Sequence, residues 1–259
     1  MAKKRIIFVL LYDQGHFSLS RNFTLQRVGD LEWLNKNYNF ENVSRFIDEL
    51  VVLNVTRESD LDWNLFVQTV RAIAEQTFVP IAVGGFNQDV RLAHNLLRSG
   101  ADRLVVNSAL FENIEFVTHL VAEYGRQSIV GSIDVQIVGN EWNSVLTRKG
   151  SRTLGVHDSK IFDSFPSELV GEILLRSIRR DGTGQGLDFE MVGLRPESLS
   201  SLPLILSGGI GKAEHMVEGL QLPTVSGVAT ANLFNFVGSG LSDARSTVIE
   251  SGIDLATWL

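Results

Sequence analysis

The 259-residue sequence contains no cysteine. Without thiolates the chain cannot form a cysteine-ligated zinc site or an iron–sulfur cluster, and it cannot use a cysteine nucleophile. The five histidines show no pair at metal-ligand spacing and no nucleotide motif is complete, so we expect neither a metal nor another cofactor. The absence of cysteine also suits a reducing compartment, and we expect a cytoplasmic protein.

Long apolar runs and an excess of positive charge are absent as well. No run approaches the ~20 residues of a membrane span, and a formal net charge of −7 gives no general attraction to nucleic acid or to an anionic membrane. Lys3-Lys4-Arg5 followed by Ile6–Leu11 resembles a signal peptide only superficially, because the apolar run is short and meets Tyr12-Asp13 at once. We interpret this run as a first strand.

Eight short apolar runs alternate with amphipathic segments such as 65–74 and 90–97. Short runs without polar alternation are typical of strands buried on both faces, as in a parallel sheet. Eight strand–helix units predict a single (β/α)8 barrel domain spanning residues 1–259, and an open doubly wound sheet is the alternative. The runs are Ile6–Leu11, Glu49–Val55, Pro80–Gly84, Arg103–Val106, Ser128–Asp134, Glu172–Ile178, Pro203–Leu206 and Val225–Ala229.

An internal repeat favours the barrel. Glu49 and Glu172 each lead an apolar run and lie 123 residues apart, and so do Leu11 and Asp134 at the ends of the first and fifth runs. A period of half the chain indicates two half-barrels of four units each, rather than a solenoid of short repeats.

Small residues gather where the C-terminal ends of the strands, the active-site face of such a barrel, are expected. Gly84-Gly85 follows the third run, Asp181-Gly182-Thr183 the sixth, and Ser207-Gly208-Gly209 the seventh. Glycine lets backbone N–H groups approach an anion, and the next helix N-terminus adds a favourable dipole. Clusters in both halves predict two phosphate sites and a substrate with a phosphate at each end. The simpler interpretation is ordinary strand-to-helix turns.

Charged residues mark both ends of the predicted barrel. Asp134 closes an apolar strand at the C-terminal face, where a partly desolvated carboxylate either moves protons or bonds loop amides as a structural group. At the opposite face Arg5, Glu49, Arg103 and Glu172 lie at or next to strand starts. They form either a ring of ion pairs across the barrel floor or a set of solvated surface charges.

Together these residues resemble the cyclase subunit of imidazole glycerol phosphate synthase, from histidine biosynthesis. The resemblance extends from Arg5 to Phe234. Its most specific segments are Asp48-Glu49-Leu50-Val51, Val83-Gly84-Gly85, Gly100-Ala101-Asp102, Ile178-Arg179-Arg180-Asp181-Gly182-Thr183 and Ser207-Gly208-Gly209-Ile210-Gly211-Lys212.

The resemblance implies a two-fold repeated barrel with a glutaminase subunit docked on its N-terminal face. Ammonia then passes a charged gate and the barrel core to reach a substrate with two phosphates. By resemblance the gate is Arg5, Glu49, Arg103 (a lysine in the family pattern) and Glu172, the phosphate contacts are Gly84, Gly85, Asn107, Ser108, Asp181, Gly182, Thr183, Gly208, Gly209 and Asn232, and the catalytic residue is Asp134.

Departures from the family pattern concentrate at the C-terminal face. Leu11 stands where the family has its other catalytic aspartate, and Leu19 stands where it has a loop lysine. A third glycine is Phe86, an active-site threonine is Arg176, and a nearby aspartate is Arg179. Loss of one of two positioned proton-transfer groups typically costs ~10²–10⁴-fold in rate. The gate charges remain, so the pattern predicts ammonia transfer without the original ring closure.

Leucine at the first catalytic position also resembles a variant branch from surface-polysaccharide pathways. That likeness implies a barrel that pairs with a glutaminase and supplies ammonia to a separate amidotransferase, which converts an acetamido to an acetamidino group. One alternative is a genuine cyclase, a lyase of histidine biosynthesis, that works with Asp134 alone or with a substitute acid such as Asp13. Another is a sugar isomerase of the same superfamily, which would also need carboxylates on the first and fifth strands.

Overall fold

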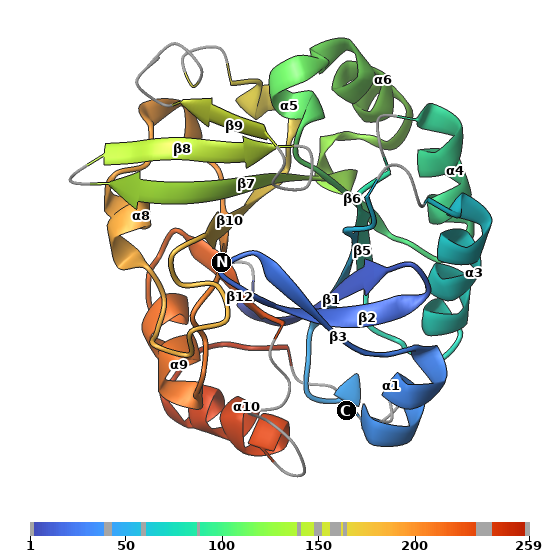
Figure 1. Cartoon of the computed structure of the whole chain (residues 1–259). Coiled ribbons are helices and arrows are strands. Elements are labelled where there is room, and N and C mark those ends of the chain that lie inside the picture. The colour runs from blue at the N-terminus through green and yellow to red at the C-terminus, as the bar shows by residue number, and fades with distance from the viewer. Residues whose placement is uncertain are drawn as a thin grey trace.

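Eight parallel strands form a closed barrel in the computed structural model, which describes residues 3–38, 43–57, 61–86, 89–138, 141–147, 152–155, 162, 165–231 and 240–256. The last strand of the barrel pairs with the first, so the sheet is a (β/α)8 barrel as predicted and not an open doubly wound sheet (Figure 1). In order around the barrel the strands are β1 (Arg5–Asp13), β4 (Glu49–Asn54), β5 (Ile81–Gly84), β6 (Arg103–Val106), β7 (Ile129–Val138), β10 (Glu172–Ser177), β11 (Leu204–Ser207) and β12 (Val225–Thr230). All eight predicted runs are barrel strands.

Helices form the layer outside the strands (Figure 1). Several begin at a residue whose side chain accepts a backbone N–H of the first turn: Asp62 accepts from Leu65, and Asn113 accepts from Phe116. No helix of the described ranges is both long and apolar enough to cross a membrane. The helices are α1 (Leu31–Tyr38), α3 (Trp63–Ala74), α4 (Val90–Arg98), α5 (Ala109–Glu112), α6 (Ile114–Tyr124), α8 (Phe189–Gly193), α9 (Ala213–Leu220) and α10 (Gly240–Glu250), with 3₁₀ turns at Arg126–Ser128, Ser167–Leu169 and Glu197–Leu199.

Successive side chains of each barrel strand belong alternately to two separate apolar cores. On β1, Ile6, Phe8 and Leu10 pack in the large core between the strands and the helices. Ile7 and Val9 belong to a second, smaller core whose fully buried members lie on the barrel strands. Because successive side chains of a strand point to opposite faces, this second core is the barrel interior.

Two antiparallel hairpins extend the barrel, and the sequence patterns did not predict either one. β2 (His16–Arg21) and β3 (Thr24–Gly29) follow β1, whereas β8 (Glu141–Thr147) and β9 (Arg152–Gly155) follow β7. Each half-barrel therefore carries a hairpin after its first strand, in agreement with the repeat. In Figure 1 the β2–β3 hairpin crosses the centre of the barrel.

A buried ion pair fixes the last helix to the barrel floor. Both guanidinium nitrogens of Arg245 on α10 contact the Asp48 carboxylate, at 3.0 and 2.9 Å. The same carboxylate accepts the backbone N–H of Ile6 at 2.8 Å, and both charged side chains are buried. Asp48 therefore connects α10 to β1 at the point where β4 begins.

We expect Asp48→Ala to lower the free energy of unfolding by about 3–5 kcal/mol, because it leaves the Arg245 charge buried without its carboxylate. Urea unfolding measures this change. The matched control is Asp254→Ala, which removes the exposed partner of Lys3 and should change stability by no more than about 0.5 kcal/mol. Equal effects of the two substitutions would contradict the role given to Asp48.

Candidate functional site

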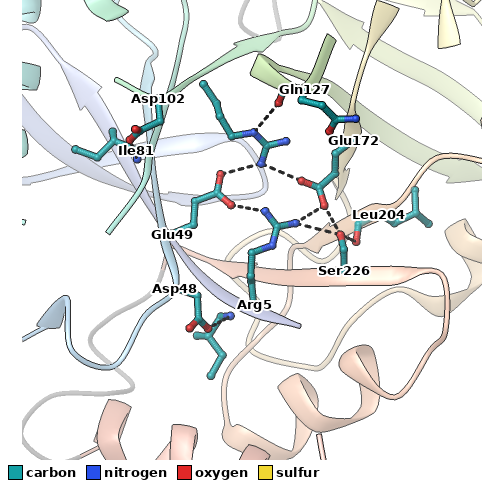
Figure 2. Close-up of polar contacts among 11 residues, drawn as sticks. Arg5, Asp48, Glu49, Ile81, Asp102, Gln127, Glu172, Leu204 and Ser226 are labelled. Carbon is teal, nitrogen blue, oxygen red and sulfur yellow. Dashed lines mark hydrogen bonds and ion pairs between the residues drawn. The ribbon is translucent and has the colours of Figure 1, made fainter. Parts of the chain in front are cut away.

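Four charged side chains close the barrel floor in a continuous ring (Figure 2). Arg5 contacts Glu49 at 2.6 Å and also Glu172, and Arg103 contacts the same two carboxylates at 3.2 and 3.0 Å. The four residues come from the first positions of β1, β4, β6 and β10. Charges therefore alternate around the ring, and each is shared by two neighbours of opposite sign.

Burial distinguishes this ring from solvated surface charges. The side chains of Glu49 and Glu172 are 2% and 6% exposed, and those of Arg5 and Arg103 are 24% and 16% exposed. Burial alone would lower the pKa of Arg5, but the attraction of Glu172 and Glu49 outweighs it and the pKa is raised. Burial also raises the pKa of Glu49, against the opposing pull of Arg5 and Arg103. The predicted ring is thus present, and the solvated alternative is wrong.

Ser226 is a fifth member of the ring that sequence reasoning missed. Its hydroxyl contacts the Glu172 carboxylate, accepts a hydrogen bond from Arg5 at 3.2 Å, and lies 3.0 Å from the Leu204 carbonyl oxygen. Ser226 is the second residue of β12, and it lies 123 residues after Arg103. The repeat offset, applied to the charged residues, identifies this position.

Above the ring the barrel interior is lined mainly by aliphatic side chains, with buried Ser132 on the inward face of β7 between Val130 and Asp134. The interior core consists of aliphatic side chains from all eight strands, and among its described members there is no charged group. A neutral small molecule meets no ionic site between the ring and the opposite end, whereas an ion would lose its hydration without compensation. The buried members are Ile7, Val9, Leu11, Val51, Leu53, Ala82, Val105, Val130, Leu174, Ile205 and Ala229.

At the C-terminal end of this interior, Asp134 faces an arginine instead of a second carboxylate. Asp134 and Arg176 are register partners on β7 and β10, and Arg176 Nε lies 3.5 Å from Asp134 Oδ1. That oxygen accepts no hydrogen bond from the described residues, and the Asp134 residue is 9% exposed. Burial raises the pKa of Asp134, the charge of Arg176 opposes this, and Asp181 adds to it. Leu11, the repeat mate of Asp134, is buried and has no group that can move a proton.

One predicted phosphate site coincides with a pocket. A cavity of about 440 Å³ lies between the β2–β3 hairpin and the turns after β10, β11 and β12. Gly209 has a φ of +94°, and a Cβ there would stand 2.0 Å from the Gly186 carbonyl oxygen, so the turn requires glycine. The lining includes Asp181, Gly182, Gly208 and Gly209, together with Leu19 from the hairpin. Asn232 lies outside the described residues.

Asp181 does not point freely into that pocket. Its carboxylate accepts hydrogen bonds from the Ser20 hydroxyl at 2.5 Å and from the Phe23 N–H at 2.9 Å, both on the hairpin. The Thr183 hydroxyl donates to the Arg180 carbonyl oxygen at 2.9 Å. Two of the residues assigned to phosphate by resemblance therefore bind other parts of the chain.

The corresponding residues of the other half are arranged differently. Gly85 has a φ of +87°, and a Cβ there would stand 2.1 Å from the Asn54 carbonyl oxygen. Phe86 turns into the core, where it is 3% exposed and its ring lies 6.2 Å from that of Phe116. The Asn107 amide donates to the Ser132 carbonyl oxygen at 2.9 Å, and Ser108 follows at the start of α5.

Two further charged residues singled out by the sequence have partners of their own. Arg179 makes a two-pronged contact with buried Asp188, at 2.7 and 2.6 Å, and also contacts Glu190. Asp13 lies 3.5 Å from Arg27 of the hairpin. Within the described ranges no three histidine, aspartate or glutamate side chains are grouped so as to hold a metal ion.

Comparison with known proteins agrees with this arrangement. A family described as histidine biosynthesis protein matches residues 32–238. The chain belongs to this family. It is 40% identical over 259 residues, covering 100% of this chain and 95% of the relative, to a protein of Parasynechococcus marenigrum named "Putative imidazole glycerol phosphate synthase subunit hisF2". It is 32% identical over 256 residues, covering 98% of this chain and 100% of the relative, to "Imidazole glycerol phosphate synthase subunit HisF" of Streptococcus mutans.

The environment of Asp134 predicts how its carboxyl titrates. Its pKa should lie above the ordinary value of 3.8, and Arg176→Met should raise it further because the opposing positive charge is removed. Carbon-13 NMR of the aspartate carboxyls follows the titration. Since a raised folded-state pKa destabilises the fold as the pH rises through it, Arg176→Met should lose stability over that range, by about 1.4 kcal/mol for each pKa unit added.

Arg179→Met is the matched control for this titration. Arg179 lies just after β10, three residues beyond Arg176, and pairs with Asp188 and Glu190, so its removal should leave the Asp134 pKa in place. An Asp134 pKa that stays constant or falls in Arg176→Met would contradict the proximity of the two charges.

Proposed function

We propose that this chain conducts ammonia and does not close the imidazole ring. In this proposal a glutaminase subunit binds the N-terminal face, ammonia passes the Arg5–Glu49–Arg103–Glu172 ring, and it leaves at the C-terminal end. The acceptor is a separate amidotransferase that converts an acetamido group of a sugar to an acetamidino group. The last step depends on the resemblance to the variant branch.

The observation that carries the proposal is the pairing of Asp134 with Arg176 opposite Leu11. Ring closure of the family type would need two groups that exchange protons with the substrate. Here Leu11 offers none, and Arg176 lies 3.5 Å from the carboxylate that remains. The guanidinium opposes the rise in the Asp134 pKa that burial causes and occupies space beside the carboxylate, so Asp134 is poorly placed to act alone as acid and base in turn.

The floor and the interior support the conducting role. Ammonia must stay neutral to remain a nucleophile, and a carboxylic acid along its path would protonate it. The interior core provides aliphatic walls, and the carboxylates of the floor ring are each paired with two guanidinium groups. A small shift of Arg5 would open a passage for a neutral molecule while Arg103 still contacts both carboxylates.

A genuine cyclase subunit of imidazole glycerol phosphate synthase is the second candidate. The cavity of about 440 Å³ beside Gly208 and Gly209 favours it, because a glycine turn before α9 is suited to a phosphate group. Asp13, the substitute acid, is held by Arg27 at 3.5 Å. That contact holds the Asp13 carboxylate beside the β2–β3 hairpin.

The proposal predicts no measurable turnover of the cyclase substrate by the purified chain with saturating ammonium salt. Leu11→Asp alone should stay inactive because Arg176 still engages Asp134, whereas Leu11→Asp combined with Arg176→Thr should gain activity on the order of 10²-fold over either single variant. Product formation followed by absorbance measures this. Rescue of a histidine auxotroph lacking the cyclase by the unmodified gene would establish the second candidate instead.

The ring should couple glutamine hydrolysis to amination of the acceptor. Arg5→Ala or Glu49→Ala leaves a buried charge unpaired and opens the floor, so more of the nitrogen from ¹⁵N-amide glutamine should escape as free ammonia, with several-fold less in the aminated product. Mass spectrometry of both pools gives the ratio. Asp254→Ala is the control, and ammonium salt should still support amination in every variant. If Glu49→Ala still coupled glutamine hydrolysis fully to amination, the ring would have no role in ammonia transfer.

A further inference from the structure

The C-terminal end of the barrel interior is covered by three side chains from three different elements. Asp134 comes from β7, Arg176 from β10, and Phe23 from the turn of the β2–β3 hairpin. Asp134 and Arg176 are only 12% and 13% exposed although they lie at the open end of the barrel. The hairpin therefore shields them from solvent.

Arg176 links the barrel to the hairpin. One edge of its guanidinium faces the Asp134 carboxylate at 3.5 Å, and its central carbon lies 5.8 Å from the centre of the Phe23 ring. This distance is within the range of a cation–π interaction. A single cation thus has one partner on the neighbouring strand and another on the hairpin, and displacement of Phe23 would expose the ion pair to water.

Phe23 contacts Arg176 from a backbone conformation that is unfavourable for an aromatic residue. Asn22 and Phe23 have φ values of 50° and 60°, the left-handed region that a two-residue hairpin turn requires. Asparagine tolerates this conformation, but it is a rare and costly one for a bulky aromatic residue, and glycine is the usual choice. The ring of Phe23 is present despite the conformation of its backbone, so its contact has a function beyond forming the turn.

Other contacts hold the turn in place over the barrel. The Asp181 carboxylate accepts hydrogen bonds from Ser20 and from the Phe23 N–H, and the Asn22 N–H donates to the Asp181 carbonyl oxygen at 3.1 Å. Gly182 is packed so closely that a Cβ there would stand 2.2 Å from the Ser20 carbonyl oxygen. The hairpin is thus seated on the turn that follows β10, the same strand that carries Arg176.

We propose that Arg176, Asp134 and Phe23 form an upper gate, which closes the C-terminal end of the barrel interior until the hairpin is lifted. The floor ring and this upper gate then enclose the apolar interior at both ends. Ammonia as the molecule retained between them rests on the proposed function, but the closure itself does not. Lifting of the hairpin, for example by a docked acceptor enzyme, would couple release of the molecule to the presence of its acceptor.

Cysteine accessibility tests the gate directly because the natural chain has no cysteine. Val9→Cys places a single thiol in the interior core, one layer below Leu11 on β1. The probe is methyl methanethiosulfonate, a small neutral thiol reagent, and mass spectrometry follows the labelling rate. The rate is compared in the parent, in Phe23→Gly and in Arg176→Leu. Phe23→Gly keeps and even relaxes the turn while it removes the ring, so a purely structural role of Phe23 predicts no change.

We expect labelling of Val9→Cys to be slow in the parent and faster on the order of tenfold in Phe23→Gly and in Arg176→Leu, the effect of losing one cation–π or ion-pair contact. Arg91→Leu, on the exposed face of α4, should leave the rate unchanged. Val117→Cys, buried between α6 and the strands, reports loosening of the whole fold and should label equally slowly in all backgrounds.

Parent-like labelling in Phe23→Gly would overturn the gate, and so would an equal acceleration at Val9→Cys and Val117→Cys. If Arg176→Leu does not fold, Phe23→Gly carries the test alone. Acceleration confined to Val9→Cys supports the gate whatever the nitrogen-transfer assay shows. If the nitrogen-transfer assay then failed, ammonia would not be the enclosed molecule, but the upper gate would still stand.

Discussion

Compensation of buried charge at the floor of a closed barrel is the constraint on which the rest of this structure depends. Pairing of β12 with β1 leaves no open edge, so the charged side chains at the strand starts pair with one another and with Ser226, and Arg103 also donates to the Gln127 carbonyl oxygen. Two arginines and two glutamates satisfy this condition because each carboxylate is shared by both guanidinium groups. Replacing any one of them would leave an uncompensated buried charge. The result is a floor ring whose two positive and two negative charges balance.

At the opposite end of the barrel a buried charge is also compensated, but by a single ion pair between Arg176 and Asp134. A second carboxylate opposite Asp134 would suit proton-transfer chemistry, but the chain has Leu11 there and places Arg176 beside the remaining acid. The pair is shielded by a hairpin whose Phe23 ring lies over the guanidinium. In the proposed function, an ion pair at the end of the barrel interior takes the place of a second proton-transfer group. This is why the proposed function concerns passage of a neutral molecule.

Much of the architecture could be predicted because it depends on local patterns. The apolar runs are unalternating since both faces of a barrel strand are buried, and the offset between Glu49 and Glu172 revealed the half-barrel repeat. The hairpins could not be predicted in this way. Phe17 and Leu19 do alternate with polar residues, but the run is short, and the turn Asn22-Phe23 lacks the glycine that normally signals a two-residue hairpin. Asp181 looked like a phosphate ligand from its sequence context, but the hairpin absent from the prediction is its partner.

By itself, the sequence determined the eight strands, their grouping into two halves and the set of charges at each end, because spacing and hydrophobicity are properties of the chain. It also determined membership of the histidine biosynthesis family, which explains the floor ring by resemblance. Only the tertiary structure decided which charges meet. Ser226 joins the ring, Arg176 engages Asp134, and the Phe23 ring contacts Arg176, although these residues lie far apart in the chain. Such contacts depend on strand register and on the path of a hairpin, which a few residues at a turn set and no periodic pattern records.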